Sequence, residues 1–166
     1  MQSLTIIAEV ADGIGMFGFA VAGLFASAGR RIDPVGVFVS VFTTAFGGGI
    51  IRDILLDLRP FYWLSHPQWI WMTLGLTILA PVIVRRVQRV WQRRSLLWAD
   101  AVGLAFFAVG SCATSDRLGH PLIVSVLIGV VTGVFGGMLR DVFCAKLPSV
   151  RSNEEPYASV AFAGCW

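Results

Sequence analysis

Two arginines, each followed directly by an aspartate, occur inside long apolar stretches of the chain. They are Arg52 with Asp53 and Arg140 with Asp141, and two residues separate each arginine from a pair of adjacent glycines. A charged side chain within a membrane costs a few kcal/mol near the bilayer centre, so it needs a partner of opposite charge or water. These residues therefore indicate fixed charges that are paired with each other or that face a polar path.

Two further aspartates in apolar stretches, Asp12 and Asp100, are the predicted partners of the arginines. We predict that Asp12 pairs with Arg52 toward the outer side of a membrane and that Asp100 pairs with Arg140 toward the inner side. Adjacent positions on a helix lie about 100° apart, so Asp53 and Asp141 are expected to be poor partners for their own arginines. They are expected instead to accept hydrogen bonds from loop residues or from the other arginine. The alternative is that both arginines extend to the lipid head groups.

The two Arg-Asp sites belong to an internal duplication with a fixed offset of 88 residues. Gly48, Gly49, Arg52, Asp53 and Pro60 recur as Gly136, Gly137, Arg140, Asp141 and Pro148. Upstream, Ala11, Asp12, Gly15, Phe19, Ala20 and Val21 recur as Ala99, Asp100, Gly103, Phe107, Ala108 and Val109. A repeat of this kind in an apolar chain indicates a duplicated membrane unit. We divide the chain into a first three-helix repeat, residues 1–87, and a second, residues 88–166.

The composition predicts an all-α membrane protein that crosses the bilayer several times. Apolar residues make up 56% of the chain and charged residues only 14%, far from the usual proportions of a soluble domain. Five stretches are long enough to span the bilayer: Leu4 to Ala28, Val35 to Leu56, Trp69 to Val84, Leu96 to Thr114 and Pro121 to Phe143. A sixth apolar run begins near Tyr157 and reaches Trp166; about ten helical residues cover only about 15 Å, so this helix is expected to be cut short.

The arginines and lysines between the spans predict the orientation of the chain. Two basic residues follow the first span, five follow the third and two follow the fifth, whereas the alternate loops hold only Arg59 and Arg117. The positive-inside rule then places the N-terminus outside the cell. The basic run from Arg85 to Arg94 could also bind anionic lipid head groups. Because each repeat holds an odd number of helices, the second repeat enters the membrane from the opposite side, so the halves are expected to be inverted.

Glycine and hydroxyl residues mark the candidate solute path. The glycines are Gly47, Gly48, Gly49, Gly133, Gly136 and Gly137. We predict that the adjacent glycines kink or break their helices and free backbone carbonyls to face a wet path; close helix packing is the alternative. The candidate pore-lining hydroxyls are Ser40, Thr43, Thr44, Ser125 and Thr132. Hydroxyls of this kind can line a path for a small solute or bond only to carbonyls of their own helix.

The two glycine-bearing segments carry a family resemblance. FGGGIIRDILL (Phe46 to Leu56) followed by Pro60, and FGGMLRDVF (Phe135 to Phe143) followed by Pro148, resemble the prokaryotic branch of the trimeric intracellular cation (TRIC) channel family. The resemblance implies two inverted three-helix repeats plus a seventh helix, which is absent or truncated here. It also implies a homotrimer in a prokaryotic inner membrane, with a potassium-conducting pore inside each subunit. The chain departs from the family pattern after Pro148.

No group of residues suggests an enzyme, a cofactor or a metal site. His66 and His120 are predicted to be loop residues, each beside a proline, and the three cysteines are scattered without metal-ligand spacing. A net charge of +3 spread over membrane loops also argues against a nucleic-acid partner, so the expected partners are lipids and further copies of the chain. Two function classes remain, a monovalent cation channel and a secondary transporter of a small solute such as glycine. Hydroxyls and helix breaks favour the channel, with potassium or sodium as the permeant ion.

Overall fold

The computed structural model describes residues 2–27, 33–87, 89–144 and 162, and within these ranges the long elements are all helices. The helices are α1 Gln2–Ser27, α2 Pro34–Leu55, α3 Tyr62–Ser65, α4 Gln68–Arg86, α5 Arg89–Arg117 and α6 Leu122–Phe143. Five of them are long and apolar enough to cross a membrane, and their positions confirm the five predicted spans. The short helix α3 was not predicted, and the sixth apolar run lies outside the described residues, Phe162 excepted.

Local signals explain where α2 begins. Asp33 precedes the helix, and its side chain accepts a hydrogen bond at 2.8 Å from the backbone N–H of Gly36. Pro34 occupies the first helical position, where its missing N–H leaves no intrahelical bond unmade. These two residues therefore explain where α2 starts, and the apolar run from Pro34 to Leu55 is long enough to cross a membrane.

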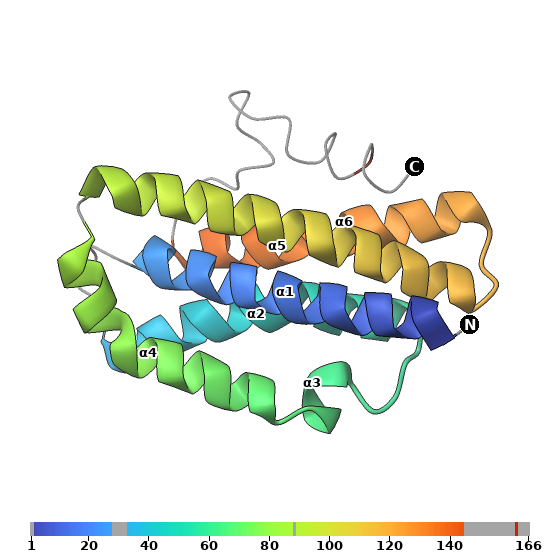
Figure 1. The fold of residues 1–166 in the computed structure, drawn as a ribbon, viewed down its shortest axis with the longest axis horizontal. Helices are drawn as coiled ribbons and strands as arrows, with labels where there is room; N and C mark the ends of the chain where they lie inside the picture. The colour runs from blue at the N-terminus through green and yellow to red at the C-terminus, as the bar shows by residue number, and fades with distance from the viewer. Residues whose placement is uncertain (1, 28–32, 88, 145–161, 163–166) are drawn as a thin grey trace.

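The helices that correspond across the 88-residue offset pack against each other. α1 packs mainly against α5, and α2 packs against α6 and α1. Figure 1 shows that α1 and α5 run in opposite directions, as do α2 and α6. Equivalent helices are thus antiparallel neighbours, which brings equivalent residues of the two halves into contact.

The contact between α1 and α5 is reciprocal at the residue level. Phe19 and Phe107 are equivalent positions, and their rings stack with centroids 5.4 Å apart. A side chain at Gly15 would meet the Phe107 ring, and one at Gly103 would meet the Phe19 ring. Such an exchange of contacts is what a two-fold relation between two similar units produces. Both rings are fully buried and form the centre of the apolar core.

The outer surface of the bundle is apolar, most clearly along α4 and α5. Trp71, Ile78 and Trp98 each expose more than 70% of their surface. Exposure of such large apolar side chains on a soluble protein would leave a large hydrophobic patch in water. A lipid environment or contact with another subunit removes this cost.

Candidate functional site

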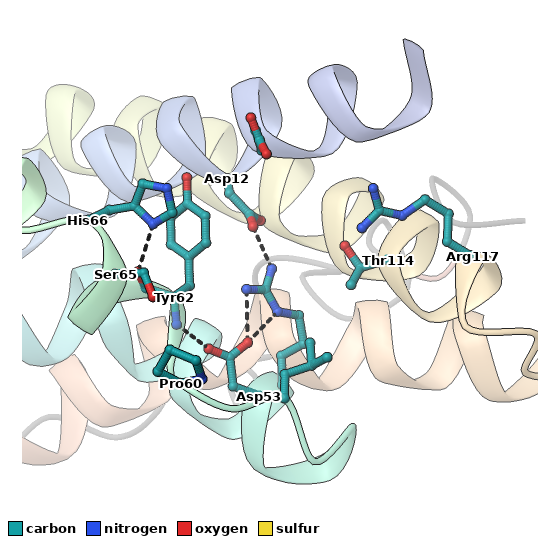
Figure 2. Close-up of a pocket in the computed structure, with 11 residues that line it drawn as sticks. Asp12, Asp53, Pro60, Tyr62, Ser65, His66, Thr114 and Arg117 are labelled. Carbon is teal, nitrogen blue, oxygen red and sulfur yellow. Dashed lines mark hydrogen bonds and ion pairs between the residues drawn. The ribbon is translucent and has the colours of Figure 1, made fainter. Parts of the chain in front are cut away.

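Arg52 lies at the centre of a buried cluster of charges near the end of α2 (Figure 2). Its guanidinium donates to Asp12 of α1, with Nη1 2.6 Å from Oδ2. Nε and Nη2 of Arg52 both lie 2.9 Å from Oδ1 of Asp53. All three residues are less than 5% exposed. The structure therefore contains the predicted Asp12–Arg52 pair, and it does not support the alternative in which Arg52 extends to the head groups.

A second cluster of the same composition surrounds Arg140 near the end of α6. Its Nη1 donates to Oδ1 of Asp100, its Nη2 lies 3.5 Å from Asp100 Oδ2, and its Nε donates to Asp141 Oδ1 at 3.0 Å. The predicted Asp100–Arg140 pair is thus also present. Because α2 and α6 run in opposite directions, the two clusters lie toward opposite ends of the bundle.

The aspartates beside the arginines bind differently from the prediction. Asp53 and Asp141 were expected to be poor partners for the adjacent arginines, and both are direct partners. The guanidinium lies at the end of a long, flexible side chain that bends toward the neighbouring carboxylate. The angle of about 100° between adjacent Cβ directions therefore does not prevent the contact.

Asp53 also holds the loop that follows α2, as predicted for an acceptor of loop hydrogen bonds. Its Oδ2 accepts from the backbone N–H of Tyr62 at 2.9 Å, which ties α3 to the charged cluster. Burial, together with repulsion from the Asp12 carboxylate, raises the pKa of the Tyr62 phenol, so this group stays neutral at physiological pH. The Tyr62 ring stacks on His66, whose Nδ1 donates to the Tyr62 carbonyl at 2.9 Å.

A partly open cavity of about 220 Å³ adjoins the Arg52 cluster (Figure 2). Besides the cluster itself, it is lined by Glu9, Ser65, His66, Thr114 and Arg117. Sequence reasoning missed this cavity and treated His66 as an ordinary loop residue. The available signal was spacing: Glu9 with Asp12, and Thr114 with Arg117, stand three residues apart and so share a helix face.

The predicted pore-lining hydroxyls are mostly buried between helices. Thr43 and Thr44 donate to carbonyls of their own helix, at Val39 and Ser40, both at 2.6 Å, which matches the alternative considered for them. The Ser40 hydroxyl donates a hydrogen bond to the backbone carbonyl of Gly23 in α1, at 3.2 Å.

In the second half, Ser125 donates to the Ser115 hydroxyl of α5 at 3.1 Å. The Thr132 hydroxyl is buried without a hydrogen-bond partner among the described residues. A pore-lining role for the five hydroxyls stays a prediction.

The glycines serve close packing where α2 crosses α6. A Cβ at Gly48 would collide with the backbone carbonyl of Thr132, and a Cβ at Gly136 would lie 2.7 Å from the carbonyl of Thr44. Both helices are continuous through these glycines, so neither helix is broken there, and a kink at the glycines stays a prediction. The physical reason is that the missing side chains let two backbones approach, while the helical hydrogen bonds stay intact.

The other glycines in these helices also lie at helix contacts. A Cβ at Gly47 would meet Leu139 at 2.6 Å, and one at Gly133 would meet Leu104 at 3.1 Å, whereas one at Gly49 would find only the Phe107 ring at 3.6 Å. Among these glycines, the approach to the backbone of a partner helix is therefore closest at Gly48 and Gly136, which are equivalent residues of the two halves.

Comparison with known sequences identifies membrane proteins of bacteria. The sequence profile described as "Glycine transporter" matches residues 9–85 and 97–166. The UPF0126 inner membrane protein YadS of Escherichia coli (strain K12) is 37% identical over 156 residues, covering 92% of this chain and 73% of that protein. A UPF0126 membrane protein of Vibrio cholerae is 33% identical, and the match covers 91% of this chain but 64% of the relative. The chain thus spans just under two thirds of the length of that relative.

Comparison with solved structures identifies cation channels. The TRIC trimeric intracellular cation channel orthologue from Rhodobacter sphaeroides matches with a TM-score of 0.88 and 30% identity, covering 96% of this chain and 80% of that one. A prokaryotic TRIC channel crystallised in 0.5 M KCl matches with a TM-score of 0.89 and 29% identity, covering 95% and 80%. These relatives are channels, which agrees with the expectation that the chain is not an enzyme. The chain therefore belongs to the glycine transporter family of membrane proteins, and it has the fold of the prokaryotic TRIC channels.

Proposed function

We propose that the protein is a monovalent cation channel, chiefly for potassium, with a pore within each subunit of a homotrimer. The observation that carries this proposal is the match to solved cation channels over nearly the whole chain. We further propose that the chain lies in a prokaryotic cell membrane with its N-terminus outside, and that its halves are inverted repeats. The antiparallel packing of equivalent helices supports the inversion.

The two charged clusters suit the passage of cations. Each holds one guanidinium and two carboxylates in contact with it. An unpaired arginine beside a path would repel cations, whereas a cluster with more carboxylates than guanidinium groups attracts them. One such cluster toward each end of the bundle would raise the local cation concentration at both entrances.

The crossing of α2 and α6 is the proposed constriction between these entrances. Backbone atoms of one helix meet the glycines of the other at Gly48 and Gly136. A continuous wet path along this crossing opens only when α2 and α6 separate. The buried hydroxyls of Thr44 and Thr132 would then be exposed to the path, where they could replace part of the hydration shell of an ion.

A secondary transporter of a small solute such as glycine is the second candidate, which the family description favours. The two functions differ in mechanism: a carrier alternates between two states, whereas a channel conducts in one open state. Vesicles that contain the purified protein and are loaded with radioactive rubidium, a potassium substitute, separate them. We expect rapid efflux that is not accelerated by unlabelled potassium on the other side. In a parallel experiment the vesicles are loaded with labelled glycine. Efflux of this glycine that is accelerated by unlabelled glycine outside the vesicles would indicate a carrier and would contradict the channel.

A further inference from the structure

Two hollows on the surface of the bundle meet at Glu9. The first is the charged cavity beside Arg52. The second is an open groove of about 540 Å³ between α1 and α4, and Glu9 lines both. The other residues that line the groove are uncharged: Val10, Gly13, Ile14, Phe17 and Trp69. The Trp69 ring packs so closely on α1 that a Cβ at Gly13 would lie 2.9 Å from it, so this ring forms one wall of the groove.

The junction of the two hollows lies where the membrane-spanning segments end. The span of α1 begins at Glu9, that of α4 begins at Gln68 beside Trp69, and that of α5 ends at Arg117. Tryptophans at the ends of spans lie at the level of the lipid head groups. The charged cavity is therefore at head-group depth, and the groove runs from it toward the bilayer centre.

The length of the groove matches the depth of one leaflet. From Glu9 to Phe17 it follows α1 for eight residue steps, which is about 12 Å along the helix axis. Half of a hydrocarbon core of roughly 30 Å is about 15 Å. The groove can therefore hold most of one acyl chain that descends from the head-group level.

Charges at the polar end of the groove keep bonding capacity that the described protein does not use. Asp12 gives Oδ2 to Arg52, but its buried Oδ1 has no hydrogen-bond partner among the described residues. Neither Glu9 nor Arg117 forms an ion pair with another residue that the structure describes. A buried carboxylate oxygen without a partner is costly, which makes it a strong acceptor for a donor that enters the cavity.

The fold itself does not require an acidic residue at position 9. In the second half, Leu97 stands at the equivalent position of α5, and the Arg140 cluster forms there all the same. Figure 2 shows Arg117 approaching the cavity from the end of α5, across from Asp12. One unused basic group thus faces the same space as the unused carboxylate oxygens.

From these observations we propose that the two hollows together bind one phospholipid whose head group carries a primary ammonium, such as phosphatidylethanolamine. The ammonium donates to the Glu9 carboxylate and to Asp12 Oδ1, and the phosphate accepts from the Arg117 guanidinium. One acyl chain lies in the groove against Trp69. The lipid supplies a positive group, a negative group and an apolar chain in the order in which the protein presents their partners.

The same contacts exclude the other common head groups. Phosphatidylglycerol has no positive group, so its phosphate could satisfy Arg117 but would leave the Glu9 and Asp12 carboxylates without a donor. Phosphatidylcholine has a positive group without an N–H, so it cannot donate to Asp12 Oδ1. The geometry therefore predicts a preference for the primary ammonium over both.

Native mass spectrometry of the purified full chain tests this proposal, with lipids of identical acyl chains added in equal amounts. We expect adducts of phosphatidylethanolamine at least five times as abundant as those of phosphatidylglycerol or phosphatidylcholine. Glycerophosphoethanolamine, the same head group without acyl chains, should not displace the lipid. Equal or stronger binding of phosphatidylglycerol would overturn the head-group assignment. Displacement by glycerophosphoethanolamine would overturn the proposal too, because the groove would then play no part.

Variants of exposed residues locate the lipid without disturbing the core. Glu9→Gln should lower the binding of phosphatidylethanolamine at least fivefold and remove the preference over phosphatidylglycerol. Val10→Trp should lower the binding of every lipid at this site, because the Val10 side chain is 54% exposed and a larger one would fill the groove. Arg85→Gln is the matched control, an exposed arginine at the end of α4, and should change neither.

Unchanged phosphatidylethanolamine binding in both Glu9→Gln and Val10→Trp would place the lipid elsewhere and overturn the proposal. A changed number of subunits in Val10→Trp, with lipid binding unchanged, would show that the groove is a contact between subunits and would overturn it as well. The inference does not depend on the channel function, since lipid binding is measured without conduction.

Discussion

At the scale of single residues, the central feature is an arginine shared by two carboxylates. Arg52 and Arg140 are each nearly inaccessible to solvent and are held by an aspartate from another helix and by the aspartate next in sequence. A buried charge without a partner is far costlier than a buried pair, so the members of such a cluster depend on one another. The clusters therefore connect helices and set the local charge at the same time.

Single and double substitutions at Asp12 and Arg52 should show this dependence. Arg52→Ala leaves two buried carboxylates facing each other, so it should cost about 3–5 kcal/mol of stability, whereas Asp12→Ala leaves Arg52 its bond to Asp53 and should cost less. The double variant should be more stable than the sum of the single losses predicts. Thermal melting of the detergent-solubilised variants measures the coupling. Strictly additive losses would mean that the Asp12–Arg52 contact contributes nothing of its own.

Asp53 should hold the loop after α2 through its bond to the Tyr62 N–H. Asp53→Asn keeps the size of the side chain but removes the charge that makes this hydrogen bond strong. We expect faster hydrogen–deuterium exchange at residues 58–66, with exchange in α4 unchanged. Asp141→Asn is the matched control, because it weakens the other cluster and should leave residues 58–66 as protected as in the parent protein. Equal protection of this loop in Asp53→Asn would contradict its anchoring role.

At the scale of elements, the crossing of α2 and α6 decides what the glycines do. Gly48 and Gly49 are adjacent, yet only Gly48 faces the backbone of the partner helix. A role in bending the helix would make both glycines important, because both supply backbone flexibility. If the glycines serve close packing, a side chain added at Gly48 should destabilise the protein more than one added at Gly49.

Alanine substitutions separate these two roles. Gly48→Ala should cost about 1–3 kcal/mol because its methyl group would overlap the Thr132 carbonyl, and Gly136→Ala should behave in the same way. Gly49→Ala meets only an ordinary contact with Phe107, and Gly75→Ala in α4 has open space around it, so both should be tolerated. Thermal melting ranks the four variants. A loss at Gly49 as large as that at Gly48 would restore the bending interpretation.

The helices and the charged pairs were predictable from the sequence to different degrees than the contacts between helices. The five spans were predictable because a helix must be about 20 apolar residues long to cross the bilayer. The Asp–Arg pairs were predictable because the spacing between Asp12 and Arg52 recurs between Asp100 and Arg140. From the sequence we predicted that the adjacent glycines bend their helices, but bending and close packing use the same residue type, and only the position of the partner helix distinguishes them. The contact between Arg52 and Asp53 depends on how the Arg52 side chain bends in the folded protein. The cavity is lined by Glu9 of one helix and Arg117 of another. Both features depend on tertiary contacts, which a local sequence pattern does not contain.

At the scale of the whole molecule, orientation in the membrane and direction of the halves are linked. The α1–α5 and α2–α6 pairs are antiparallel, and the basic residues concentrate in alternate loops. In the proposed orientation, which rests on the positive-inside rule, the loop with α3 and the cavity beside it would lie outside the cell. The Arg140 cluster would face the cytoplasm.

Cysteine accessibility in intact cells tests this orientation. In a variant without the native cysteines, Gln68→Cys at the start of α4 should react with an impermeant thiol reagent added outside. Gln88→Cys, between α4 and α5, should react only after the cells are opened. Labelling of Gln88→Cys but not of Gln68→Cys in intact cells would reverse the orientation proposed here.

Current recording from the purified protein in a planar lipid bilayer tests the proposed channel most directly. With unequal KCl concentrations on the two sides, we expect discrete unitary currents whose reversal potential lies close to the potassium equilibrium potential, as a path with net negative clusters at both ends requires. Gly49→Ala should leave these currents in place, since its added methyl group does not obstruct the helix crossing. A protein that is folded and inserted but gives no unitary current, or currents that reverse at the chloride potential, would contradict the account.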